Sequence, residues 1–221
     1  MKRIYRTSPG SVVRNMLVLL ILLSMGSCAT TIPELQVRYT LPAPSDTLKG
    51  RAVALTIEDR RADTSILGKG AREEFERSSD SVSLSVAEPD QKGSSVGIFQ
   101  APALVREAFN RRLARSGVKV LSDRTAGVPT LVIVLKTFSL DLVGRKWLAK
   151  MSYEARLTGE KGAVATQFVN GQAERYKVIG RDGGDTLMGE VFTDMVNALN
   201  PARLFEQTGL SSVHFSPVPK G

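Results

Sequence analysis

The stretch Leu131-Val132-Ile133-Val134-Leu135 decides the fold, because five consecutive apolar residues predict a strand that is buried on both faces. We expect this strand to run from Thr130 to Leu142. A strand of this kind lies at the centre of a sheet, so helices must cover at least one of the two sheet faces.

Two further strands follow the central one along the chain. Residues 148–157 alternate apolar and polar side chains, which predicts one face toward the core and one toward water. Gly159-Glu160-Lys161-Gly162 predicts a hairpin turn, and residues 163–179 predict a long return strand. Asn170-Gly171 interrupts this strand. Because the preceding residues are needed to pair with residues 148–157, we interpret the interruption as a bulge or a bend.

Shorter strands precede the central one. Apolar residues alternate with small or polar ones at residues 53–57 and 82–86, and both segments predict strands. Residues 118–121 predict a third. The segments 58–70 and 88–95 are rich in charge, Gly or Pro, which is typical of surface loops.

The chain also predicts two amphipathic helices. The first begins at Pro102 and ends at Gly117, which supplies a left-handed cap, and its apolar face is formed by Val105, Phe109 and Leu113. The second follows Gly183-Gly184, with Asp185 as its cap, and its apolar stripe is formed by Leu187, Val191, Met195 and Leu199. A further helical turn is expected at 201–207.

Short connections favour antiparallel pairing of neighbouring strands. Two amphipathic helices need a sheet face on which to bury their apolar sides. We therefore predict an α+β fold: a two-layer sandwich in which both helices pack on one face of a mostly antiparallel sheet.

The N-terminus has the pattern of a secretory signal. Four basic residues precede an apolar run from Met16 to Leu23, which is too short to span a bilayer. The order Met25-Gly26-Ser27-Cys28 then resembles a bacterial lipoprotein signal, in which the thiol is acylated and Cys28 becomes the first mature residue. Ala29 resembles lipoproteins sent to the outer membrane. The alternatives are an ordinary signal with a cysteine nearby by chance, or an uncleaved signal anchor.

These patterns divide the chain into segments. Pro33, Pro42 and Pro44 predict an extended tether, although Gln36 to Leu41 is compatible with a short edge strand. We expect a signal peptide at 1–27, a lipidated N-terminus and tether at 28–50, a periplasmic domain at 51–210 and a flexible tail at 211–221.

The charge of the chain argues against nucleic acid as a partner. Removing residues 1–27 takes away four of the 30 basic residues and none of the 22 acidic ones, so the net charge falls from +8 to +4. This surplus is too small for a nucleic-acid interface. It suits either an ordinary soluble surface or a weak attraction to anionic lipid headgroups.

Few residues have the chemistry of a catalytic or metal site. His214 is the only histidine and Cys28 the only cysteine, and acylation would consume the thiol of Cys28. Gly68-Lys69-Gly70 lacks the glycine spacing of a phosphate-binding loop. The sequence therefore predicts no catalytic residue, no cofactor and no metal ligand.

The sequence permits two interpretations for each of two groups of residues. Asp59 and Asp63 are either a pair of catalytic carboxylates, or part of a structural or interaction loop that Asp–Arg hydrogen bonds with Arg61 hold together. Arginines that close keep a carboxylate ionised, which argues against a general acid. Phe138 and Trp147 flank a turn and are expected to pack in the core or at the sheet edge, with an exposed partner contact as the alternative.

The lipoprotein cysteine, Asp59, Arg61, Gly117 and the strand Leu131 to Leu135 together resemble the YajG family of Gram-negative outer-membrane lipoproteins. The similarity runs from about Thr30 to Leu210. It implies a lipid-anchored domain facing the periplasm. The family is uncharacterised, so the resemblance implies no reaction.

Three functions follow from these patterns. The first is a non-enzymatic, lipid-anchored accessory for binding or assembly, with membrane lipid and an envelope protein complex as partners. The second is a lipid- or glycan-binding module with a pocket between sheet and helices. The third is a hydrolase that uses Asp59 and Asp63.

Overall fold

A computed structural model of the chain describes residues 35–75, 81–87, 94–121, 127–159, 162–178 and 182–209. All of them belong to one compact unit, Pro33–Gly221. The predicted signal peptide, Cys28, His214 and the predicted tail at 211–221 lie outside the described residues.

The larger sheet has five strands in the order β5-β2-β6-β7-β8. Their bounds are β2 (Ala52–Asp59), β5 (Lys119–Leu121), β6 (Thr130–Val143), β7 (Lys146–Thr158) and β8 (Val164–Tyr176). β6 is the central strand, as predicted from its apolar run, and Leu131, Ile133, Val134 and Leu135 are buried. The α+β class is therefore confirmed.

A second sheet has three strands, β1 (Leu35–Thr40), β3 (Ser81–Ala87) and β4 (Ser94–Gln100), in the order β1-β3-β4. The prediction of a single sheet is therefore wrong: the strands form two sheets, and both contain parallel as well as antiparallel pairs. β1 pairs with β3 in parallel, and β2 is parallel to both β5 and β6. The β2–β5 pair is parallel because the chain between them includes a helix, and such a crossover returns the chain in the same direction.

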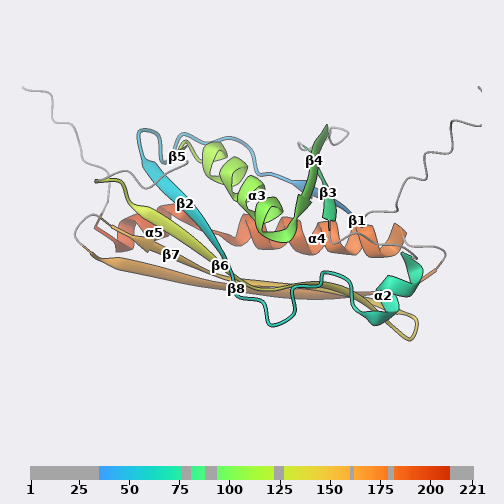
Figure 1. Cartoon of the computed structure of the whole chain (residues 1–221). Coiled ribbons are helices and arrows are strands. Elements are labelled where there is room, and N and C mark those ends of the chain that lie inside the picture. Colours follow the sequence, from blue (N-terminus) through green and yellow to red (C-terminus); the bar gives the residue numbers. More distant parts are fainter. Residues whose placement is uncertain are drawn as a thin grey trace, which may run out of the picture. The chain divides into compact units, whose positions relative to one another are not determined.

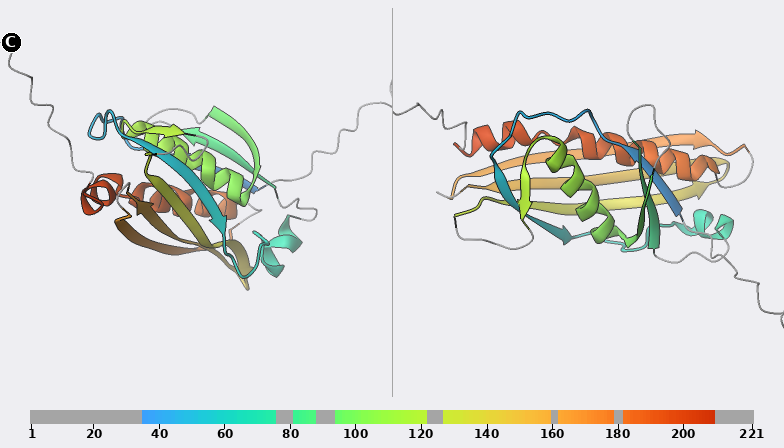
Figure 2. Two further views of the ribbon diagram at one scale, coloured as in Figure 1. Left: turned by 60° about the vertical axis from the view of Figure 1, so that its left-hand side comes forward. Right: turned by 90° about the horizontal axis from the view of Figure 1, so that it is seen from above.

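Two helices, α3 (Ala101–Arg115) and α4 (Asp182–Ala198), lie on the same side of the five-stranded sheet (Figures 1 and 2). Tyr153 of β7 contacts both. Its ring packs edge-on against Phe109 of α3 at 5.1 Å between centroids, and its hydroxyl donates to the carbonyl oxygen of Met195 of α4 at 2.9 Å. Two short helices, α2 (Lys69–Glu74) and α5 (Pro201–Gln207), complete the described elements.

The predicted helix ends are partly correct. Pro102 lies in the first turn of α3, and Gly117 follows its end with a φ of 84°, so both signals are confirmed. α4 begins at Asp182, so Gly183 and Gly184 lie inside the helix rather than before it. Asp185 accepts a hydrogen bond from the Gln36 amide at 3.0 Å and is not the N-cap.

Residues 35–50 belong to the packed domain rather than to a tether. Leu35, Val37, Tyr39 and Leu41 are buried in the core. The alternative of an edge strand is confirmed, because β1 lies at one edge of the three-stranded sheet. Prolines in this segment suggested a tether, but the apolar alternation of β1 outweighs them because its side chains fill the core.

The predicted bulge at Asn170-Gly171 is wrong. β8 pairs with β7 in one continuous register from Val164 to Tyr176. Gly171 instead lies under α4, where a Cβ would come within 2.4 Å of the Met195 Cε atom. The register shift of this sheet lies in β6, between Leu135 and Thr137.

Two elements were not predicted. α2 has only six residues, which is too short for a helical period to show in the sequence. β4 has no buried residue, and exposed and half-buried side chains follow one another irregularly along it. Its sequence therefore lacks the apolar–polar alternation that would predict a strand.

Candidate functional site

Asp59 and Arg61 form a bidentate ion pair at the end of β2. Arg61 donates from Nε and Nη2 to the two carboxylate oxygens of Asp59 at 2.9 and 2.8 Å. The Arg61 side chain is 4% exposed and that of Asp59 is 23% exposed. Hydrogen bonds from the Arg61 side chain hold the pKa of Asp59 below its usual value. A general acid needs a raised pKa, so Asp59 is unsuited to that role.

Asp63 makes a different contact. Its Oδ1 accepts a hydrogen bond from the Ser65 amide at 2.8 Å, which is the geometry of an Asx turn. Arg72 closes the same loop by donating from Nε to the Leu67 carbonyl at 2.9 Å. Asp59 and Asp63 thus have separate partners, whereas a hydrolase would need both carboxylates to act on one substrate.

The loop after β2 is attached to the edge of β6. The Arg60 amide donates to the Leu135 carbonyl at 2.9 Å, and the Leu140 amide donates to the Ile66 carbonyl at 2.8 Å. Ile66 and Leu67 are buried. Residues 60–67 therefore run beside β6 after β2 has ended. Their backbone hydrogen bonds and buried side chains fasten the segment to the sheet, which is a structural role.

Gly68 and Gly70 lie so close to β6 that neither position has room for a side chain. Oδ1 of Asp141 accepts hydrogen bonds from the amides of Gly70, Ala71 and Leu142 at 3.1, 3.3 and 2.8 Å. A Cβ on Gly70 would come within 2.0 Å of the Leu142 carbonyl oxygen. The start of α2 thus binds a carboxylate of the protein itself.

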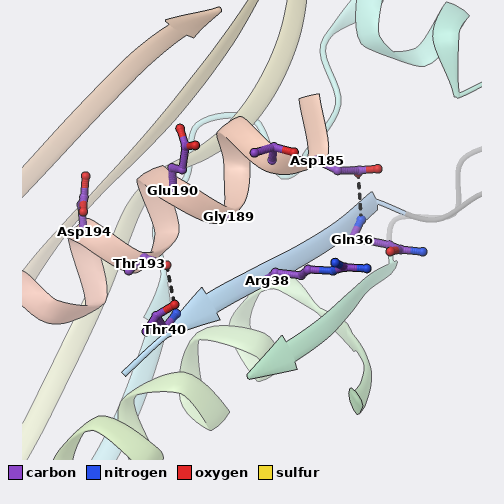
Figure 3. A pocket seen from close by; sticks show the side chains of 9 residues that line it. Gln36, Arg38, Thr40, Asp185, Gly189, Glu190, Thr193 and Asp194 are labelled. Atoms are coloured by element: carbon purple, nitrogen blue, oxygen red, sulfur yellow. Dashed lines mark hydrogen bonds between the residues drawn. The ribbon is translucent and has the colours of Figure 1, made fainter. Parts of the chain in front are cut away.

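A polar groove of about 770 Å³ lies between β1 and α4 (Figure 3). Its wall on the β1 side consists of Gln36, Arg38 and Thr40, and its wall on the α4 side consists of Asp185, Thr186, Gly189, Glu190, Thr193 and Asp194. No pattern in the sequence predicted this groove. The sequence of β1 does indicate one exposed polar face, because its exposed residues alternate with buried ones.

α4 takes the place of a neighbouring strand along β1. The amide of Thr40 donates to Thr193 Oγ1 at 3.2 Å, and Asn197 Nδ2 donates to the Thr40 carbonyl at 2.8 Å. Together with the bond from Gln36 to Asp185, these bonds satisfy backbone groups that an edge strand otherwise leaves unpaired. The edge of β1 is therefore covered by helix side chains rather than by a strand.

The groove offers hydrogen bonds and charge rather than a nucleophile. Its lining includes three acidic residues and Arg38 but neither His nor Cys. Glu190 is paired with Arg175 of β8 at 2.8 and 2.9 Å. No cluster of three metal-ligating side chains occurs among the residues that the structure describes. This arrangement can hold a polar ligand.

The other face of the five-stranded sheet, opposite α3 and α4, carries an exposed aromatic residue. Phe168 of β8 is 74% exposed and lies beside Glu154 of β7 in the strand register. Glu154 is paired with Arg156 and Lys136, and the hydrogen bond from Arg156 lowers the pKa of Glu154. Phe168 is thus a large aromatic ring exposed to water beside an ion-paired carboxylate, and aromatic residues are enriched in protein–protein interfaces.

Phe138 and Trp147 do not contribute to such a surface. Both are buried: Phe138 packs edge-on against Phe192 at 5.9 Å, and Trp147 packs against Phe75 at 6.3 Å. The prediction that both belong to the core is confirmed. None of the described helices combines the length and the hydropathy that a transmembrane helix requires.

Comparison with known proteins gives similarity of fold alone. No protein-family model matches the chain, and no curated protein sequence matches it. A DUF330 protein from Xanthomonas campestris is 16% identical with a TM-score of 0.47, over 81% of this chain and 97% of that chain. Two bacterial lipoproteins are also similar. Rare lipoprotein B from Shewanella oneidensis is 10% identical (TM-score 0.31, 65% of this chain and 84% of that one). Lipoprotein GNA1162 from Neisseria meningitidis is 11% identical (TM-score 0.34, 66% and 96%).

The similar structures are thus a DUF330 protein and bacterial lipoproteins. With TM-scores below 0.5 and identities below 25%, they carry no argument about function. The resemblance to the YajG family stays a prediction.

Proposed function

We propose that this protein is a non-enzymatic lipoprotein, anchored at the outer membrane and facing the periplasm, that acts as a binding or assembly accessory for an envelope complex. The observation that carries the proposal is the order Met25-Gly26-Ser27-Cys28 directly behind a basic segment and a short apolar run. Small residues before the cysteine fit the narrow cleft of a signal peptidase.

Acylation at Cys28 would provide the anchor. Each buried methylene contributes about 0.8 kcal/mol, and two or more chains hold a protein on a bilayer that one chain alone would not retain. Ala29 in place of an aspartate supports export to the outer membrane.

The contacts of Asp59 support a role without catalysis. Of the candidate carboxylates that the sequence offered, Asp59 is ion-paired with the buried Arg61 and Asp63 forms a turn with Ser65. The two carboxylates therefore have separate partners, whereas a hydrolase needs a pair that acts on one substrate.

The surface around Phe168 supports the accessory role. Phe168 is exposed, and it lies on the sheet face away from α3, because its neighbour Val169 pairs with Tyr153, which contacts that helix. Aromatic residues are enriched where proteins contact one another. An envelope protein that covers this ring would remove a large apolar group from water.

The anchor is tested with Cys28→Ala in the intact cell. We expect the protein to leave the outer-membrane fraction, to migrate more slowly on a gel as the unprocessed form, and to lose labelling by an alkyne analogue of palmitate. Met25→Leu is the matched control, since it keeps Cys28 and should be processed normally. Unchanged fractionation and mobility of the Cys28→Ala protein would refute the anchor.

The accessory role is tested by placing a photo-crosslinking amino acid at Phe168. We expect illumination of living cells to join the protein to one envelope component of defined mass. The same amino acid at Asp46, which is exposed in the segment beside the end of α3, should give no such product. Equal products from both positions, or none from Phe168, would count against a partner at this sheet face.

A second candidate, a glycan-binding module, is favoured by the groove between β1 and α4 alone. The lipid-binding version needs surplus apolar space between sheet and helices. Tyr153 and Phe109 are in contact there, and the cavity of about 610 Å³ between α3 and the strands β2 and β5 is lined by charged as well as apolar side chains. Calorimetric titration with soluble cell-wall glycan fragments tests it. We expect heat of binding in the native protein and its loss in Arg38→Ala and Asp194→Ala. The absence of heat in the native protein would rule it out.

A further inference from the structure

We propose that one end of the domain rests on the membrane surface, with its exposed apolar side chains at the level of the lipid headgroups. We call this the membrane-facing end, and it consists of Val143, Arg145, Lys146, Tyr176, Lys177 and Val178. The inference deepens the proposed function and rests on it, because it requires a lipid on Cys28.

The apolar side chains of the membrane-facing end are exposed. Val143 is 62% exposed, Tyr176 is 68% exposed and Val178 is 85% exposed. They form one patch. Val143 lies opposite Lys146 in the pairing of β6 with β7, and Lys146 lies opposite Tyr176 in the pairing of β7 with β8. Exposed apolar groups gathered in this way mark an interaction surface.

Basic side chains surround this patch. Lys146 lies over the ring of Tyr176, with its Nζ atom 5.2 Å from the centroid, and it is paired with Glu174 at 3.0 Å. The Lys177 amide donates to the Arg145 carbonyl at 2.8 Å, and the Lys177 side chain is paired with Glu74. Arg145 is exposed and makes no ion pair with any residue that the structure describes. It is therefore available to an anionic phosphate.

This combination of groups matches the chemistry of a lipid interface. A tyrosine places an apolar ring among acyl chains while its hydroxyl stays in water, and long basic side chains extend their charges toward the headgroups. Two of the three basic side chains, Lys146 and Lys177, already have an acidic partner. We therefore expect the apolar residues to contribute most of the binding free energy at the bilayer, and the basic residues to orient the domain.

The chain enters the domain at this same end. Gln36, near the start of β1, donates from its amide to Asp185 of α4. Gly184, one residue earlier in α4, lies against the Trp147 ring, since a Cβ there would be 3.0 Å from the indole. Trp147 follows Lys146 directly. Figure 1 shows the start of β1 and the turn between β6 and β7 at the same end of the sheet.

The chain between the lipid and the domain is short. Cys28 and Leu35 are seven positions apart, so this segment spans at most about 25 Å when fully extended. β6 has 14 residues and is about 46 Å long. The anchor therefore keeps the membrane-facing end close to the bilayer, while the turn between β7 and β8 can reach it only if the domain lies flat.

The test uses the full, lipidated chain in vesicles of phosphatidylethanolamine and phosphatidylglycerol. Because Cys28 is acylated, a cysteine introduced as Val143→Cys is the only free thiol and accepts a single fluorophore. The matched control is Val164→Cys, since Val164 is 57% exposed and lies at the start of β8, at the opposite end of the sheet. Brominated lipids quench a fluorophore that touches the bilayer.

We expect quenching at position 143 to be several times stronger than at position 164. Arg145→Glu should reduce it, whereas Arg203→Glu, the same charge change in α5, should not. Equal quenching at both positions would overturn the inference. The inference would also be overturned if neither position were quenched while the protein still floated with the vesicles. In that case the lipid anchor is intact, and only the proposed orientation is wrong. If the protein does not float with the vesicles, the proposed function itself fails.

Discussion

Gly189 of α4 lies so close to Arg38 of β1 that a Cβ on the glycine would come within 2.4 Å of the Arg38 carbonyl oxygen. This approach lets a helix lie along the edge of the three-stranded sheet. The hydrogen bonds from β1 to Asp185 and Thr193 depend on it, because a larger residue would move the helix away from the strand.

We therefore expect Gly189→Ala to destabilise the protein. Alanine favours a helix over glycine by about 1 kcal/mol, but the clash is with backbone, and overpacking of this kind costs about 1–3 kcal/mol. Urea unfolding should show a lower midpoint. Gly171→Ala is the matched control, because its predicted clash is with the flexible end of Met195. An equal loss in both variants would mean that the backbone contact has no special role.

Two buried tyrosines should respond differently to loss of the hydroxyl. Tyr153 donates to the Met195 carbonyl, so Tyr153→Phe should lower the free energy of unfolding by about 1 kcal/mol. The Tyr39 hydroxyl is buried and has no hydrogen-bond partner among the residues that the structure describes. Tyr39→Phe should therefore leave the free energy of unfolding unchanged or raise it, because burying a hydroxyl without a hydrogen bond is unfavourable. Thermal unfolding of the two variants side by side checks this, and a larger loss in Tyr39→Phe would contradict it.

The Asp59–Arg61 pair should make stability depend on pH. Because the pKa of Asp59 is lowered in the folded state by Arg61, the pair stabilises the protein fully above the ordinary aspartate pKa of about 3.9. This contribution is lost as the pH falls from there through the lower folded-state pKa. We expect Asp59→Ala to cost about 2–3 kcal/mol at neutral pH, between the values of exposed and buried pairs.

Denaturant unfolding at a series of pH values measures the effect. Native protein should lose more stability between about pH 4 and pH 2 than Asp59→Ala does. In a double-mutant cycle, Asp59→Ala with Arg61→Ala should cost less than the two single changes added together. Additive losses would show that the two side chains do not interact in solution.

Asp141 should hold α2 against β6. Its Oδ1 accepts three backbone amides, and loss of a helix-capping oxygen costs about 0.5–2 kcal/mol. In Asp141→Ala we expect faster hydrogen exchange at Gly70, Ala71 and Leu142. Asp63→Ala is the control, since Asp63 accepts one amide in an exposed turn. Unchanged exchange at all three amides would exclude the capping role.

The sequence predicted those parts of the candidate site that neighbouring residues build. The expected Asp–Arg contact forms between Asp59 and Arg61, two positions apart, so residue type and spacing were enough to predict it. Asp63 instead accepts a hydrogen bond from the Ser65 amide. The groove between β1 and α4 was missed, because Arg38 and Glu190 are far apart in the chain and no local pattern relates them.

By itself the sequence determined the α+β class, the central position of β6, the hairpins from β6 to β8 and the ends of α3 at Pro102 and Gly117. Each of these depends on a local period or on the conformational preference of one residue. Three features depend on the folded chain instead: β1 pairs with β3 in a second sheet, α4 covers the edge of β1, and Gly70, Gly184 and Gly189 allow close packing. Such contacts join residues distant in the chain, and their geometry exists only once the chain has folded.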